Sequence, residues 1–122
     1  MAKTKQAFGT LLREKRLAKG YSLRKFAEMV GVSPTYLSLI EQGKLEHPPT
    51  AERVRVMAKL LGEDPDHWIG LAGRVPDDME AIIRNQPEAM PALLRAAKGL
   101  TADELRKLAE QLRRKSEDKK KE

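Results

Sequence analysis

Residues 22–43 read SLRKFAEMVGVSPTYLSLIEQG, and this stretch decides the fold. Apolar residues recur at helical spacing on both sides of a central Val-Gly-Val, which predicts two short helices at 22–30 and 33–42. Gly31 stands where a chain that leaves a helix needs a positive φ, which glycine adopts at little cost. Ser33 is a favoured N-cap, and Pro34 suits the first turn because its missing N–H would have had no partner. The stretch is therefore expected to form two helices joined by a tight turn.

Apolar stripes predict a further helix before this motif, at residues 8–19 and ending at Gly20. Its apolar side chains are expected to face a core: Phe8, Leu11, Leu12 and Leu17. Its basic side chains are expected to face solvent: Arg13, Lys15, Arg16 and Lys19.

Five helices are expected after the motif, at 51–61, 65–71, 76–85, 87–98 and 102–114. Pro48 and Pro49 keep the segment before the first of them as a loop, because consecutive prolines cannot continue a helix. Thr101 and Glu104 form a capping box that opens the last one. No segment alternates like a strand, so the predicted fold class is all-α.

The helices are expected to form two parts. Residues 8–72 would make a five-helix domain, and residues 75–114 a small C-terminal helical module. Residues 1–7 and 115–122 are polar and charged, and they are expected to be flexible tails.

The chain has 122 residues and a formal charge of +6, which favours a polyanionic partner. Residues 1–25 carry eight basic residues against Glu14 alone. The simplest alternative is a solvated helix face, but this charge immediately precedes the helix–turn–helix, which favours nucleic acid.

Several other classes of protein are disfavoured by the composition. The chain has no cysteine, so disulfides and thiolate metal sites are excluded. No apolar run resembles a signal peptide or a membrane span, and we expect a cytoplasmic protein. His47 and His67 have no second histidine at metal spacing, and paired carboxylates sit at helix starts where they suit caps. We therefore expect no catalytic residues, no cofactor and no metal.

Residues 8–71 resemble the lambda-repressor-like (Cro/repressor, XRE-type) helix-turn-helix family, over a little more than half of the chain. The likeness is carried by the runs LAKGYSLRKFAEMVGVSPTYLSLIEQGK and HPPTAERVRVMAKLLGEDPDHWI. The shared spacings include Ala27 four residues before Gly31, the small polar start at Ser33, and Glu41 before Gly43. The resemblance implies a five-helix DNA-binding domain whose third helix lies in the major groove of double-stranded DNA.

Carried over position by position, the resemblance implies six candidates for base readout: Ser33, Pro34, Thr35, Tyr36, Ser38 and Leu39. It implies phosphate contacts from Ser22, Arg24, Gln42, Lys44 and Arg53. Many family members carry Gln at the positions of Pro34, Thr35 and Leu39, so readout here should depend on small polar and apolar contacts and on DNA shape. Family members also often carry Gln at the position of Leu23. The alternatives are ordinary solvated charge for Lys44 and Arg53, and a half-buried ring for Tyr36.

The three predicted C-terminal helices are short and amphipathic, so each must bury its apolar stripe on something. We expect a homodimer interface formed by Leu93, Leu94, Leu105, Leu108 and Leu112. The alternative is that these helices pack back onto Trp68 of the same chain.

These observations predict a sequence-specific DNA-binding transcriptional regulator, a homodimeric repressor that reads a palindromic operator. The alternative is an antitoxin-type protein, whose C-terminal helices bind a partner protein while the helix-turn-helix autoregulates. The absence of a catalytic cluster argues against an enzyme.

Overall fold

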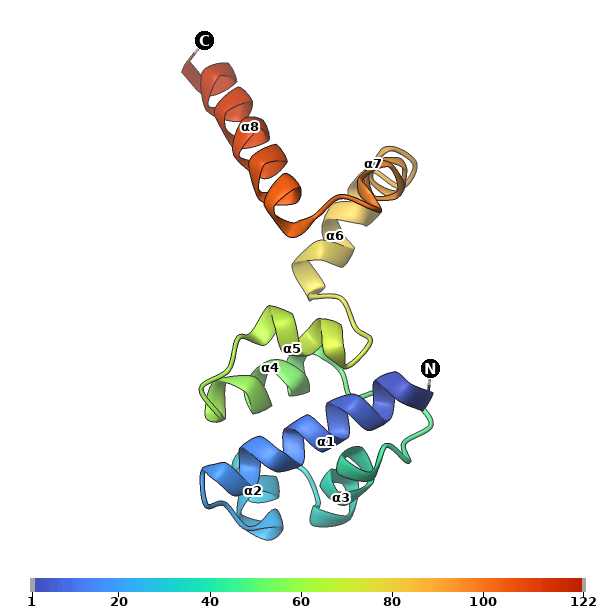
Figure 1. Cartoon of the computed structure of the whole chain (residues 1–122), viewed down its shortest axis with the longest axis vertical. Helices are drawn as coiled ribbons and strands as arrows, with labels where there is room; N and C mark the ends of the chain where they lie inside the picture. The colour runs from blue at the N-terminus through green and yellow to red at the C-terminus, as the bar shows by residue number, and fades with distance from the viewer. Residues whose placement is uncertain (1, 122) are drawn as a thin grey trace. The chain divides into compact units, whose positions relative to one another are not determined.

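The computed structural model describes residues 2–121, which form eight α-helices and, over that range, no strand (Figure 1). The chain divides into two compact units, an N-terminal unit up to Ala81 and a C-terminal unit from Ile82. The helices of the first unit are α1 (Ala2–Ala18), α2 (Leu23–Val30), α3 (Pro34–Gln42), α4 (Ala51–Leu60) and α5 (Pro65–Leu71). The boundary falls within α6 (Asp77–Asn85), and α7 (Ala89–Ala97) and α8 (Ala102–Lys121) follow it. The predicted all-α class is confirmed.

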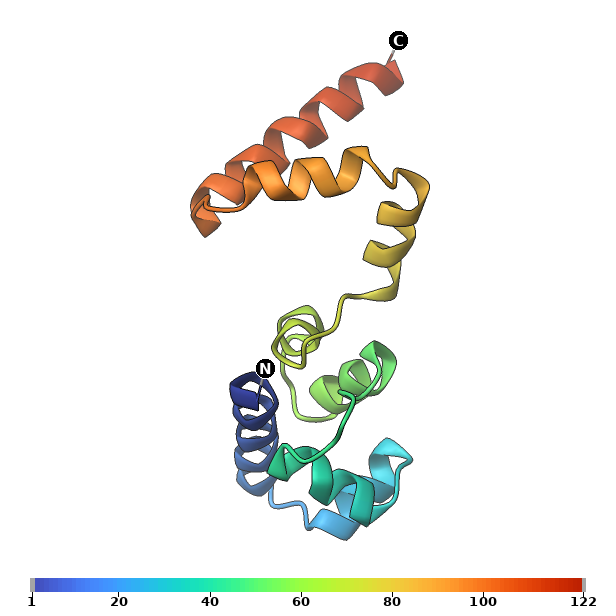
Figure 2. The same ribbon diagram turned by 90° about the vertical axis from the view of Figure 1, so that its right-hand side faces the viewer.

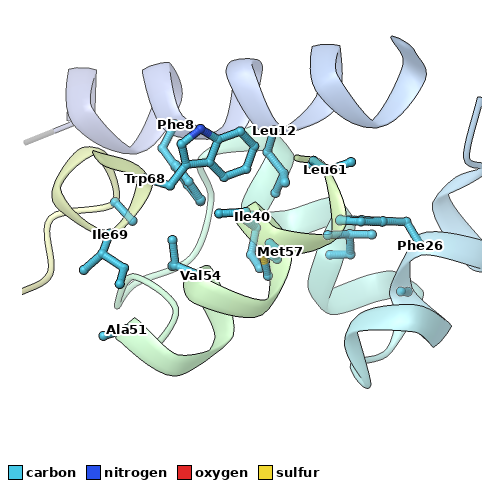
Figure 3. Packing of buried hydrophobic residues seen from close by; sticks show 14 residues of the cluster. Phe8, Leu12, Phe26, Ile40, Ala51, Val54, Met57, Leu61, Trp68 and Ile69 are labelled. Atoms are coloured by element: carbon cyan, nitrogen blue, oxygen red, sulfur yellow. The ribbon is translucent and has the colours of Figure 1, made fainter. Parts of the chain in front are cut away.

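The N-terminal unit is built around a single apolar core to which all five of its first helices contribute (Figure 3). Its largest fully buried side chains are Leu12, Phe26, Leu37, Val54, Met57 and Trp68. Trp68 of α5 meets Phe8 of α1 edge to face, with ring centroids 5.7 Å apart. Aromatic pairs favour this geometry, so the Trp68–Phe8 contact closes the first helix against the last helix of the domain.

The turn between α2 and α3 has the predicted chemistry. Gly31 has a φ of 89°, and its N–H and that of Val32 both donate to the Ala27 carbonyl, at 2.9 and 3.0 Å. Ser33 then caps α3, since its Oγ accepts from the Tyr36 N–H at 3.0 Å. The left-handed glycine ends one helix and the serine starts the next, which fixes the angle at which α3 leaves α2.

Helix α3 lies beside both α1 and α2 (Figures 1 and 2). Its approach to α1 depends on Gly9, because a Cβ built on that residue would lie 2.4 Å from the Ile40 carbonyl oxygen. Any larger side chain would force the two helices apart. Gly9 is thus a packing requirement that the hydrophobic pattern alone did not reveal.

The bounds of two predicted helices are wrong, while those of the other six lie within two residues of the observed ones. Helix α1 begins at Ala2, so residues 2–7, expected as a flexible arm, are helical; Met1 lies outside the described residues. Helix α8 runs to Lys121 rather than ending near residue 114, through most of the expected C-terminal tail.

For two residues of α1, the exposure predicted from the sequence is wrong. Leu17, expected in the core, is 53% exposed, and Arg16, expected in solvent, is only 6% exposed. The reason is the phase of the helix: Phe8, Leu12 and Arg16 follow one another at four-residue spacing and share one stripe. Leu17 comes one residue later and is turned away from that stripe.

The C-terminal unit has no core of comparable kind. None of the side chains that the structure describes from Ile82 onward is buried. Leu93, Leu94, Leu105 and Leu112 are all exposed, and Leu108 is half-buried. The capping box at the start of α8 is confirmed: the Thr101 N–H donates to Glu104 Oε1 at 3.0 Å, and the Glu104 N–H donates to Thr101 Oγ1 at 3.2 Å.

Candidate nucleic-acid interface

Helix α3 divides its side chains between the core and the solvent. Leu37 and Ile40 are buried, with exposed fractions of 0% and 3%. The six candidates for base readout are all exposed or half-exposed: Ser33, Pro34, Thr35, Tyr36, Ser38 and Leu39. The core contacts on one side of α3 therefore leave the other side, beginning at its N-terminus, open to a ligand.

Two of the candidate hydroxyls already act as helix caps. Ser22 Oγ accepts from the Lys25 N–H, and Ser33 Oγ accepts from the Tyr36 N–H, both at 3.0 Å. Each hydroxyl keeps its own proton, so Ser22 and Ser33 remain hydrogen-bond donors. A donor matches a phosphate oxygen or a base acceptor, and the caps hold both donors in place.

Ser38 and Gln42 are joined in the structure although they were predicted for different roles. Gln42 Nε2 donates to Ser38 Oγ at 2.7 Å, across one turn of α3. The Ser38 hydroxyl proton stays available, and the bond restrains the longer Gln42 side chain against its helix. Ser38 and Gln42 therefore form one hydrogen-bonded polar surface on α3.

Tyr36 and Arg53 are also brought together, from α3 and the first turn of α4. Arg53 Nη1 donates to the Tyr36 hydroxyl at 3.2 Å, and its guanidinium carbon lies 5.1 Å from the centroid of the ring. The cation is therefore held over the aromatic face, and within residues 2–121 it forms no ion pair with a carboxylate. Tyr36 is half-buried, as the alternative interpretation expected, but its hydroxyl faces Arg53.

Ion pairs engage some cations of the N-terminal unit and leave others without a carboxylate partner among the described residues. Lys15, Arg16 and Arg55 form ion pairs, with Glu63, Glu41 and Glu52 respectively. Among the described residues, no ion pair engages the three cations predicted to meet phosphate: Arg24, Lys44 and Arg53. Arg24 lies in α2, Lys44 in the loop after α3 and Arg53 in α4, so all three belong to the segments that precede and follow α3.

A buried ion pair joins α1 to α3, between Arg16 and Glu41. Arg16 Nε and Nη2 donate to Glu41 Oε2 and Oε1 at 2.7 and 2.9 Å, and Arg16 Nη1 donates to the Tyr21 carbonyl at 2.9 Å. The paired side chains are 7% and 5% exposed. Arg16 and Glu41 each lie four positions after a buried leucine of their own helix, Leu12 and Leu37, but the sequence does not show that the two charges meet.

The loop between α3 and α4 is held by two cations that the sequence did not single out. Lys5 Nζ donates to the carbonyls of Leu45 and Glu46, at 2.8 and 2.7 Å. Arg74 donates to the carbonyls of Pro49 and Pro48, at 3.1 and 2.8 Å. No local pattern could have revealed contacts between residues 25 to 41 positions apart.

Other chemistry receives no support from the part of the chain that the structure describes. Over residues 2–121, no three His, Cys, Asp or Glu side chains are grouped so that they could hold a metal ion. Within the same range, no helix combines the length and the apolar character needed to cross a membrane.

Two capped helices joined by a left-handed glycine, with the second one exposed and supported by three more helices, define a helix-turn-helix protein. A family model described as helix-turn-helix matches residues 12–68. The clp gene regulator ClgR from C. glutamicum is 34% identical over 57% of this chain and 87% of that chain, with a TM-score of 0.49. The restriction-modification controller protein C.AhdI from Aeromonas hydrophila is 27% identical over 55% and 94%, also with a TM-score of 0.49.

A chain of the SinR protein/SinI protein complex is 24% identical over 89% of this chain and 98% of that one, with a TM-score of 0.47. No curated protein matches the chain significantly. The family model matches residues 12–68, so this part of the chain belongs to the helix-turn-helix family of DNA-binding transcriptional regulators, as the resemblance predicted, and this is not a family of enzymes.

Proposed function

We propose that the protein is a sequence-specific repressor that binds a palindromic operator as a homodimer, with α3 in the major groove. The observation that carries the proposal is the exposed start of α3 flanked by Arg24, Lys44 and Arg53, whose charges no carboxylate neutralises among the described residues. Base edges would be read by Ser33, Pro34, Thr35, Tyr36, Ser38 and Leu39, and phosphates met by Ser22, Arg24, Gln42, Lys44 and Arg53. Repression would follow from occupation of a promoter by a protein that works in the cytoplasm.

Dimerisation is proposed because one α3 covers only one half-site, and proteins of this class read two half-sites about one helical turn apart. Residues 8–72 would form the DNA-binding domain and residues 75–114 the dimerisation module. The exposed leucines of α7 and α8 support this division: Leu93, Leu94, Leu105 and Leu112, together with the half-buried Leu108. Exposed apolar side chains in this number indicate a surface that is covered in the working protein.

The same leucines support a second candidate, an antitoxin-type protein whose C-terminal helices bind a different protein. Light scattering on the purified chain separates the two. A homodimer is expected under the first proposal, whereas a monomer that becomes a complex only with a co-expressed partner would favour the second.

The test of DNA reading begins with selection of bound sites from random double-stranded DNA, which returns the half-site and its spacing. On the selected operator, Thr35→Ala combined with Ser38→Ala is expected to weaken binding by about 1–3 kcal/mol for each interaction with a base that the substitutions remove. Ser116→Ala is the matched control, because it removes an exposed hydroxyl from α8. Unchanged operator affinity in the double variant, with an intact fold by circular dichroism, would show that α3 is not the reader.

A further inference from the structure

The loop from Gly43 to Thr50 connects the proposed reading helix to α4, and it has no regular secondary structure. It carries Lys44 near its start, and it ends at Thr50, whose Oγ1 caps α4 by accepting from the Arg53 N–H at 3.2 Å. Both proposed phosphate contacts after α3, Lys44 and Arg53, therefore depend on the path of this loop.

The loop cannot fix that path by itself. Pro48 and Pro49 supply no backbone N–H, so the usual hydrogen bonds of a turn are not available around them. Four of the loop's carbonyls are instead engaged from outside, by only two side chains. Lys5 of α1 donates hydrogen bonds to the carbonyls of Leu45 and Glu46. Arg74, which follows α5, donates to the carbonyls of Pro48 and Pro49.

These contacts are stronger than ordinary turn bonds, because the donor carries a full positive charge in each. Lys5 and Arg74 are both half-buried, and neither has an ion-pair partner among the described residues. Their charge is directed at backbone oxygens rather than at a carboxylate. Two cations thus hold the loop, one at residues 45–46 and one at residues 48–49.

We propose that Lys5 and Arg74 are positioning residues for DNA binding: they fix the loop so that Lys44 and Arg53 meet phosphates with a set spacing. The inference rests on the proposed function, since it assumes that this loop faces DNA. It makes one distinctive prediction: the contribution of Lys44 to operator binding exists only while the loop is held.

A double-mutant cycle on the full-length protein and its selected operator tests this prediction. In the parent, Lys44→Ala is expected to weaken binding about tenfold, as for loss of one charge-assisted bond. It is also expected to lower the slope of log affinity against log salt by about 1. In an Arg74→Met background, Lys44→Ala is expected to change affinity less than about twofold, because Lys44 no longer stands at its phosphate.

Two further variants separate positioning from a general effect of charge. Arg74→Lys keeps the charge and can donate to both proline carbonyls from one nitrogen, as Lys5 does to its pair, so it should restore the Lys44 effect. Arg55→Met removes a guanidinium of α4 whose hydrogen bonds in the described part of the chain go to Glu52, so the effects of Arg55→Met and Lys44→Ala on operator affinity should be additive.

Additive effects of Arg74→Met and Lys44→Ala would overturn the inference, and so would a parent in which Lys44→Ala changes nothing. In both cases the proposed function would stand, since the parent would still bind its operator. A parent without sequence preference would overturn the proposed function and the inference with it. If circular dichroism shows that Arg74→Met does not fold, Lys5→Met replaces it in the same cycle. Lys5→Met releases the loop at residues 45–46 and should also reduce the effect of Lys44→Ala.

Discussion

The two units of the chain treat their apolar side chains in opposite ways. In the N-terminal unit, Leu12, Phe26, Leu37 and Met57 are completely buried, and one core joins α1 through α5. In the C-terminal unit, Leu94 is 57% exposed and Leu112 is 48% exposed. The first unit is stabilised by a buried apolar core, whereas the leucines of the second unit stay exposed.

The proposed DNA reading and the proposed association with another chain need different kinds of surface. A surface that reads DNA must keep small polar groups at fixed positions, and a close-packed core gives that rigidity. A surface that binds another chain must keep apolar groups exposed until the partner arrives, and short amphipathic helices do so. Substitutions of similar kind should therefore have different consequences in the two units.

The largest effect is expected from Trp68, which fills the core between α5 and α1. Trp68→Ala should lower the free energy of unfolding of the N-terminal unit by about 3–5 kcal/mol, measured by chemical denaturation. Leu94→Ala is the contrasting variant and should change the same transition by less than about 0.5 kcal/mol. Equal losses would mean that both units share one cooperative core.

The buried ion pair between Arg16 and Glu41 gives the next largest effect. Glu41→Ala leaves Arg16 charged in a site that is almost closed to water, and should lower the free energy of unfolding by roughly 3 kcal/mol. Glu63→Gln breaks the more exposed pair with Lys15 and should cost at most about 1 kcal/mol. A similar small loss in both variants would show that Arg16 finds enough support from the Tyr21 carbonyl alone.

Local signals in the sequence explain why most of the N-terminal unit could be predicted. Caps and terminators act within a few residues of the helix end that they specify, and Ser33, Pro34 and Gly31 all lie where the pattern expects them. In α4, the buried residues Val54, Met57 and Ala58 lie at helical spacing, which is a pattern that the sequence shows directly. Such features depend on the chain's own neighbours, which a sequence shows directly.

The features that could not be predicted depend on residues far apart in the chain. The start of α1 at Ala2 is supported by Lys5, whose partners lie in the loop about forty residues later. Arg16 is buried because Glu41 comes from another helix, and Gly9 is needed because the Ile40 carbonyl lies against it. A hydrophobic pattern treats Arg16 as a surface residue, since charge burial is favourable only once the partner is known.

The candidate site shows the same division. Its candidates on α3 come from the family resemblance, and the structure shows them exposed or half-exposed. The pairing of Tyr36 with Arg53 and of Ser38 with Gln42 required the structure. Whether these side chains contact bases or phosphates remains a prediction for the binding experiments proposed above.

A moderate effect is expected at the exposed leucines, where the two units should respond differently to the same substitution. If Leu105 is buried on dimerisation, Leu105→Ser should weaken the dimer by about 2 kcal/mol, or roughly thirtyfold in its dissociation constant. Leu17→Ser is the matched control, an exposed leucine of the N-terminal unit that should leave the dimer unchanged. Analytical ultracentrifugation measures both, and an equal response in the two variants would remove the proposed interface from α8.

The smallest effect is expected at the start of α8, where the two units cap their helices differently. Hydrogen bonds from the Thr101 backbone and then its side chain lower the pKa of Glu104 below its ordinary 4.5, whereas α3 is capped by the uncharged Ser33. Because the pKa is lower in the folded chain, Glu104 stabilises α8 above its unfolded pKa, and this stabilisation is lost as the pH falls through the folded value.

Between pH 7 and pH 3, the amide proton of Thr101 should therefore titrate in NMR spectra with a midpoint below 4.5, while that of Tyr36 should show no comparable step. Glu104→Gln keeps the capping geometry without the charge, so it should abolish the step at Thr101 and leave α8 helical throughout. A midpoint at or above 4.5 in the parent would mean that the capping box does not persist in solution.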